Sequence, residues 1–279
     1  MTKTSVLATS AISQLFLLTS AHAGGGAIVA PGPVSECADI AGGLPLPFGV
    51  SVFYMRQESN YDVTSLHATA FGYPVPGLGA NIIPRVHSTA DTVNAKLDWW
   101  AQPWLNFHAI FGYVSGSADA DVSLPPQLAP LLGGINGFRV NYNGIVYGGG
   151  MTLAAGYKSF FASVTGNYTW ADVDLQGGSG LALNDANNMG TLVITPKVGW
   201  RFDKGSLWAG AFYQSTEHTQ YGRFNSSLGS VNFNASVRDS APWNFVMGGE
   251  FDITKHWILT GEVGLGHREQ VMFGTSYRF

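Results

Sequence analysis

The chain has 279 residues, of which 11% are charged and 13% aromatic, with 36 glycines and a formal net charge of −4. Soluble domains typically carry about 25% charged residues. Beyond the first 23 residues there is no apolar run long enough for a transmembrane helix, and the net charge is too small to argue for nucleic-acid binding. Composition therefore excludes a helical membrane protein and favours strands that alternate between lipid and lumen.

Residues 1–23 predict a secretory signal peptide. Lys3 supplies the positive start, residues 5–20 are uncharged, and the segment ends in the small-x-small cleavage pattern Ala21-His22-Ala23. Residues 24–47, rich in Gly, Ala and Pro, predict an irregular periplasmic segment. The chain has a single cysteine, Cys37, so it has no internal disulfide.

From residue 48 onward, period-two segments alternate with turn signals and predict ten strands, with eight or twelve left open. The expected strands cover about 48–58, 89–100, 104–115, 138–156, 160–171, 190–202, 206–215, 242–252, 257–266 and 270–279. The even-numbered strands up to the eighth end in short turns, whereas the first, third, fifth and seventh end in long links. This pattern predicts an all-β fold, a membrane-spanning up-and-down antiparallel β-barrel over 48–279, with both termini in the periplasm.

Aromatic residues gather near both ends of the expected strands, as the two interfacial belts of a barrel require. Those beside the short turns are Trp99, Trp100, Trp104, Tyr157, Trp200, Phe202 and Trp257, and those near the opposite ends are Tyr113, Tyr168, Trp170, Tyr213 and Trp243. Pro196 lies inside the sixth strand and cannot donate to a ladder, so it requires a bulge or a locally broken bond.

The segment from Val271 to Phe279 alternates and finishes on an aromatic side chain. It resembles the terminal strand of bacterial outer-membrane barrel proteins, in which the assembly machinery engages a final phenylalanine. Val271, Phe273, Tyr277 and Phe279 match that pattern, whereas Thr275 fits it less well. The resemblance implies an outer-membrane location and makes Phe273, Tyr277 and Phe279 the candidate assembly signal, without selecting a subfamily.

If the aromatic and aliphatic face is outside, strand parity sends a set of charged side chains into the lumen. These candidate lumen residues are Lys96, Asp98, Lys197, Arg201, Glu250, Asp252, Glu262 and Arg278. Four are basic and four acidic, which predicts paired ions in a narrow interior rather than the one-sign lining of a wide pore. For Arg201, Asp252 and Arg278 the alternative is a water-exposed position at the periplasmic rim.

No catalytic, cofactor-binding or metal-ligating residue is assigned. The histidines have no nucleophile at a recognisable spacing, and the acid pairs Asp119/Asp121 and Asp172/Asp174 lack the other ligands of a calcium loop. The sequence predicts a non-enzymatic barrel that acts as a narrow channel or in a structural or binding role. Its expected partners are outer-membrane lipid and lipopolysaccharide and, during insertion, the barrel assembly machinery, and no nucleic acid.

Two alternatives remain. The expected loops contain apolar runs at 71–78, 82–84 and 124–132, and contiguous apolar surface usually contacts something. These runs favour uptake of a hydrophobic small molecule as the second reading. A membrane-embedded hydrolase is the third, and it would require a Ser–His or Asp–His contact at one rim.

Overall fold

Period-two alternation along the chain produces strands throughout the described residues, which are 46–70, 73–74, 86–121, 137–177, 181–183, 186–226 and 229–279 of a computed structural model. The strands are β1 (Phe48–Ala70), β2 (Tyr73–Pro74), β3 (Val86–Gln102), β4 (Leu105–Asp121), β5 (Gly137–Tyr157), β6 (Phe160–Gly177), β7 (Leu181–Leu183), β8 (Ala186–Phe202), β9 (Gly205–Ser226), β10 (Gly229–Asp239), β11 (Trp243–Asp252), β12 (Trp257–Leu265) and β13 (Arg268–Arg278). None of the described segments is a helix long and apolar enough to cross a membrane.

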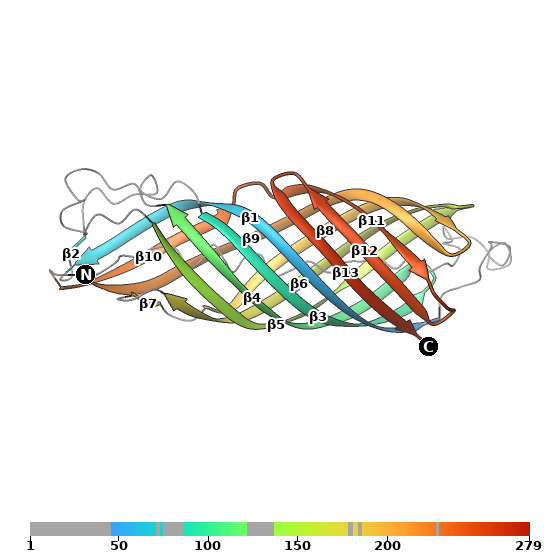
Figure 1. The fold of residues 1–279 in the computed structure, drawn as a ribbon, viewed down its shortest axis with the longest axis horizontal. Coiled ribbons are helices and arrows are strands. Elements are labelled where there is room, and N and C mark those ends of the chain that lie inside the picture. Colours follow the sequence, from blue (N-terminus) through green and yellow to red (C-terminus); the bar gives the residue numbers. More distant parts are fainter. Residues whose placement is uncertain are drawn as a thin grey trace.

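The strands form one antiparallel sheet that closes on itself, because β1 pairs with β3 on one side and with β13 on the other (Figure 1). All ten expected strands are present, so the all-β up-and-down barrel is confirmed. The two ends of the barrel sequence meet at this seam, where Phe48 and Phe279 exchange backbone hydrogen bonds of 3.2 and 3.0 Å. The expected signal peptide, Cys37 and most of the apolar loop runs lie outside the described residues.

The barrel has two tiers, which the sequence did not predict. Along β1, residues from Gly49 to Ser59 pair with β13, whereas residues from Tyr61 to Ala70 pair with β10. Strand β9 changes partner in the same way, from β11 in its first half to β10 in its second. Since β10 takes the place of β11, β12 and β13, a ten-stranded lower tier next to the C terminus continues into an upper tier in which β10 lies between β9 and β1 (Figure 1).

Parts of the expected long loops therefore belong to strands. They were not predicted as strands because their apolar residues lie on the inward face, whereas the apolar residues of the lower tier lie on the outward face. In the lower part of β1 the apolar side chains Val52 and Tyr54 face outward, while beyond it Tyr61 and Val63 face inward and Asp62 faces outward. Strands β5 and β6 change phase similarly. A strand in lipid is apolar outside, but a strand in water hides its apolar side inside. The reversal marks where each strand leaves the membrane.

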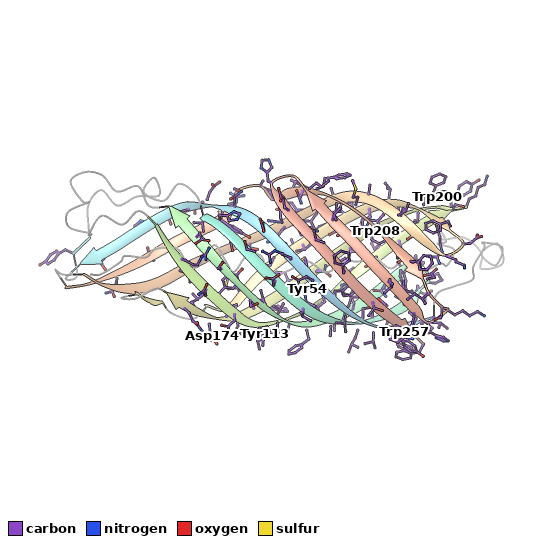
Figure 2. The ribbon with its side chains drawn as sticks, viewed as in Figure 1. Tyr54, Tyr113, Asp174, Trp200, Trp208 and Trp257 are labelled. Atoms are coloured by element: carbon purple, nitrogen blue, oxygen red, sulfur yellow. The ribbon has the colours of Figure 1, made fainter. Side chains whose placement is uncertain are left out.

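The outward face of the lower tier carries both aromatic belts. Trp200 and Trp257 lie at the end near the C terminus, whereas Tyr54 and Tyr113 lie about midway along the molecule (Figure 2). One expected member is wrong: Trp100 points inward and is only 8% exposed, because its neighbour Trp99 takes the outward position. Strand parity allows only one of two consecutive residues to face the lipid.

Pro196 interrupts one ladder without shifting its register. It pairs with Val164 of β6, but toward β9 the paired residues jump from Ile194–Tyr213 to Lys197–Gly210. The required defect is thus a locally broken ladder and not a bulge.

Candidate functional site in the barrel interior

The eight candidate lumen residues all occupy inward positions of the lower tier. Six of them are at most 6% exposed, namely Lys96, Asp98, Lys197, Glu250, Glu262 and Arg278. The side chains of Arg201 and Asp252 are 23% and 22% exposed, so these two lie at the wet rim, whereas Arg278 does not. Parity dictates this placement, because each charge alternates with an outward apolar residue.

Lys197 and Glu262 form an ion pair that crosses the lumen. Lys197 comes from β8 and Glu262 from β12, with β9 and β11 between them in the sheet. Trp208 Nε1 also donates to Glu262 Oε2 at 2.9 Å, and Lys197 Nζ lies 5.1 Å from the Trp208 ring centre. The carboxylate thus has a cation and an N–H donor, as a buried charge requires.

A second pair closes the barrel seam. Arg278 of β13 donates to Asp98 Oδ2 of β3 at 2.9 Å, and Asn106 Nδ2 donates to the same oxygen at 3.1 Å. Arg278 also donates to the backbone oxygen of Leu46 at 3.1 Å. Lys96 lies two residues along β3, with its Nζ 5.6 Å from the Phe53 ring centre. This layer joins the first, second and last strands of the lower tier.

The third group lies at the rim next to the C terminus. Arg201 donates to Glu250 Oε1 at 3.2 Å and to Asp252 Oδ2 at 2.7 Å. Two carboxylates on one strand thus share a guanidinium from β8, whose planar fork can serve both. Beside these charges the interior is filled by an apolar cluster of Trp100, Ala154, Phe161 and Trp208.

Glycines on the intervening strands allow these bridges. Gly49 is paired with both Asp98 and Arg278, and a Cβ at Gly49 would lie 2.5 Å from Asp98 Oδ1. Gly248 is likewise paired with both Trp208 and Glu262, and its Cβ would lie 2.8 Å from the indole. A glycine on the strand between leaves room for the side chains of the two flanking strands to meet across it.

A glycine has the same role at Gly150, the last residue of the run Gly148-Gly149-Gly150. His108 of β4 and Asn167 of β6 both pair with Gly150 of β5, and His108 Nε2 lies 2.5 Å from Asn167 Oδ1 above it. A Cβ at Gly150 would lie 2.8 Å from the imidazole. The glycine therefore serves packing of a buried polar pair.

One interior ion pair was missed by sequence reasoning. Arg268 donates to Asp239 Oδ1 at 2.9 Å and to Ser59 Oγ at 3.2 Å, and its guanidinium lies 5.4 Å from the Phe212 ring centre. It lies at the junction of the two tiers, where β1 changes partner from β13 to β10. Extending the last strand by two residues would have placed Arg268 inward beside Gln270. Asp239 fell in an expected loop and carried no such signal.

Above this junction the interior changes from charged to apolar. The buried residues of the upper tier and its base include Val63, Val86, Ala90, Val114, Ala118, Val140, Tyr142, Val146, Val173 and Leu175. They form the core of a water-surrounded tube, in the way that small barrels fill their interiors.

Among the residues that the structure describes, no three His, Cys, Asp or Glu side chains gather as a metal site would need.

The comparisons with known proteins agree on shape alone. No protein-family model and no curated protein matches the sequence. Similar solved structures include the outer membrane protein OprG of Pseudomonas aeruginosa, with 9% identity, 86% of this chain and 100% of that chain covered, and a TM-score of 0.46. The translocator domain of the autotransporter NalP of Neisseria meningitidis has 13% identity, 88% and 92% coverage, and a TM-score of 0.42.

A third structure is the outer membrane protease OmpT of Escherichia coli, with 8% identity, 84% of this chain and 97% of that chain covered, and a TM-score of 0.47. These proteins differ widely in role, so they point to none for this chain. Its own closed antiparallel barrel, with an apolar outer band between two aromatic belts, is the architecture of bacterial outer-membrane β-barrel proteins.

Proposed function

We propose that the protein is a sealed, non-enzymatic β-barrel of the outer membrane, whose lower tier spans the lipid and whose upper tier stands outside the cell in a structural or binding role. The observation that carries this proposal is the layer of buried ion pairs across the lumen. Lys197–Glu262 and Arg278–Asp98 have side chains at most 6% exposed, so both pairs are largely shielded from water. A wide conducting pore would keep such charges hydrated and would favour one sign.

A solute-flux assay tests the seal. Liposomes that contain the purified protein should not swell in isotonic arabinose. Liposomes that contain a water-filled porin at the same density should swell. The double variant Lys197→Ala/Glu262→Ala removes the cross-lumen pair and serves as the partly opened comparison. Swelling of wild-type liposomes at the porin rate would refute the sealed barrel and leave a channel.

The orientation is part of the proposal. Four lower-tier turns next to the termini are two or four residues long, at 103–104, 158–159, 203–204 and 253–256, whereas the opposite ends extend far beyond the apolar band. Short turns face the periplasm in barrels of this class. Protease added to intact cells should therefore cut only in the upper tier and its loops. Cleavage at Lys158 in intact cells would invert the topology.

The assembly signal is consistent with the same picture. Phe273, Tyr277 and Phe279 share the outward face of β13, with exposed fractions of 61%, 38% and 56%. An aromatic row on the last strand is accessible before the seam with β1 closes. We assign its recognition to the barrel assembly machinery.

The absence of an enzymatic role is supported by the contacts of three histidines. His108 lies against Asn106 and Asn167, His87 Nδ1 lies 3.3 Å from Asn60, and His256 Nδ1 lies 2.7 Å from a backbone oxygen. None of these partners is a serine nucleophile or an orienting carboxylate. The side chain of His218 lies outside the described residues. Hydrolysis of added peptide or lipid that is abolished by His108→Ala would overturn this part.

One observation favours a second candidate, uptake of a hydrophobic small molecule. The upper tier has an apolar interior of valine and alanine, open in principle to an apolar guest if those side chains rearrange. A fluorescent hydrophobic probe that enters proteoliposomes only when the barrel is present would favour it. The buried ion pairs of the lower tier argue against passage of a hydrophobic molecule through the whole barrel.

A further inference from the structure

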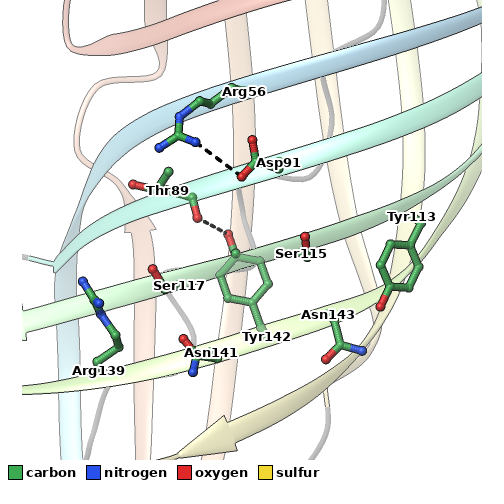
Figure 3. A pocket seen from close by; sticks show the side chains of 11 residues that line it. Arg56, Thr89, Asp91, Tyr113, Ser115, Ser117, Arg139, Asn141, Tyr142 and Asn143 are labelled. Carbon is green, nitrogen blue, oxygen red and sulfur yellow. Dashed lines mark hydrogen bonds and ion pairs between the residues drawn. The ribbon is translucent and has the colours of Figure 1, made fainter.

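The outer wall carries a polar hollow directly above the apolar band, on β1, β3, β4 and β5. Its volume is about 720 Å³. Figure 3 shows two arginines, Arg56 and Arg139, at its edges, with short polar side chains between them. The shorter side chains that line it include Thr89, Ser115, Ser117, Asn141 and Asn143.

The hollow begins where the lipid-facing surface ends. On β1 the outward residue Tyr54 is followed by Arg56, and on β4 Tyr113 is followed by Ser115. On β5 the outward Ile145 gives way to Asn143. A lipid whose acyl chains lie on the apolar band would thus place its headgroup in the hollow.

The arginines are held only by exposed ion pairs. Arg56 lies 3.6 Å from Asp91 and 3.7 Å from Glu58, with its side chain 54% exposed. Arg139 donates to both carboxylate oxygens of Asp119, at 2.8 and 2.7 Å, with its side chain 64% exposed. Because both arginines are exposed, water and salt screen these pairs, and a phosphate, which also accepts two hydrogen bonds from a guanidinium, can compete with the carboxylates.

The spacing of the arginines selects the kind of headgroup. Arg56 is on β1 and Arg139 on β5, three strand spacings away, which is about 14 Å across the sheet. By register Arg56 is level with Asn143, and Arg139 lies four residues further along β5, which adds about 13 Å along the strand and puts the two backbone positions about 19 Å apart. A single phosphodiester cannot reach both. A saccharide bearing a phosphate at each end can, and its hydroxyls would meet the serines and asparagines between, with Asp91 as a further acceptor.

We propose that this hollow binds the bisphosphorylated saccharide headgroup of an outer-leaflet glycolipid, with one phosphate at Arg56, the other at Arg139 and the acyl chains over Tyr54 and Tyr113. The proposal rests on the orientation given above, since only the outer leaflet would present such a lipid at this height. It gives the expected lipopolysaccharide partner a defined site on β1, β3, β4 and β5.

Binding to purified, delipidated wild-type protein in detergent tests it, with native mass spectrometry as the readout. The ligands are lipid A with two phosphates, lipid A with one, and phosphatidylglycerol. Arg56→Gln/Arg139→Gln should weaken binding of the bisphosphorylated lipid at least about tenfold. The control Lys158→Gln/Lys204→Gln removes two positive charges at the opposite rim and should leave binding unchanged.

Three outcomes would overturn the site: equal binding by the arginine variant, equal loss in the control, or phosphatidylglycerol binding as tightly as the bisphosphorylated lipid. If wild-type protein bound lipid A with one phosphate as tightly as lipid A with two, the two-arginine geometry would be wrong. Because the assay is done in detergent, it is independent of orientation. Binding here combined with protease cleavage at Lys158 in intact cells would refute the topology and not the site.

Discussion

Removing the charge of either Lys197 or Glu262 should lower the free energy of unfolding substantially. Removing both charges should lower it less than either single substitution does. Their side chains are 1% and 6% exposed. Lys197→Met leaves the buried Glu262 carboxyl group without its cation and with the Trp208 N–H, at 2.9 Å, as its remaining described partner. Removing one partner of a buried pair costs about 3–5 kcal/mol.

Glu262→Gln should cost less than Lys197→Met. The amide oxygen still accepts from Trp208, and the lysine keeps the indole face 5.1 Å away, which is worth about 0.5–2 kcal/mol. In the double variant Lys197→Met/Glu262→Gln neither position leaves an unpaired buried charge, so the loss should fall to about 0–2 kcal/mol. The expected order of destabilisation is Lys197→Met, then Glu262→Gln, then the double variant.

The assay is equilibrium urea unfolding of the barrel in lipid vesicles, followed by far-ultraviolet circular dichroism and by heat-modifiable gel mobility. Tryptophan emission is avoided because Trp208 touches the pair. Arg139→Met, which breaks an exposed pair outside the membrane, is the control and should change stability little. Single variants as mild as this control, or a double variant whose cost equals the sum of the singles, would show that the lumen is wet and the pair uncoupled.

Three further substitutions and one control variant probe the fold. Gly49→Ala should separate Asp98 from Arg278 and destabilise by about 1–3 kcal/mol in the same assay, whereas Gly166→Ala, whose Cβ meets nothing within 4 Å, should be neutral; equal effects would disprove the bridging role. Phe107→Arg, on the outward face beside the belt residue Trp99, should cost up to about 2 kcal/mol, because the cost of an arginine falls from about 2–4 kcal/mol at the bilayer midplane to about 0–1 kcal/mol at the interface, and unchanged stability would mean that this face does not contact lipid. Phe279→Asp should lower the amount of folded, heat-modifiable barrel in cells, and normal levels would count against the assembly signal.

The lower tier could be predicted because its chemistry is periodic. Lipid on one side and a narrow lumen on the other impose a period of two on every strand, and the alternation of turn lengths then orders the strands. The upper tier escaped prediction because its alternation is reversed. Tyr61 and Val63 continue β1, yet they face inward where Val52 and Tyr54 face outward.

The lumen charges could be assigned to the interior, but their partners could not. Parity gives the face of a residue, whereas a contact across the lumen depends on the stagger of strands far apart in the sequence. Lys197 and Glu262 are 65 residues apart. Gly49 and Gly248 mark the places where two inward side chains meet. A glycine in the sequence can be interpreted in this way only when the register of the strands on both sides is known.

The measurement that tests the sealed barrel most directly is the single-channel conductance of the wild-type protein in a planar bilayer. Buried, paired charges across the lower tier predict little or no steady conductance at any moderate voltage. Large, stable conductance steps whose ion selectivity follows the charge at Lys197 or Glu262 would contradict the account and establish an open pore.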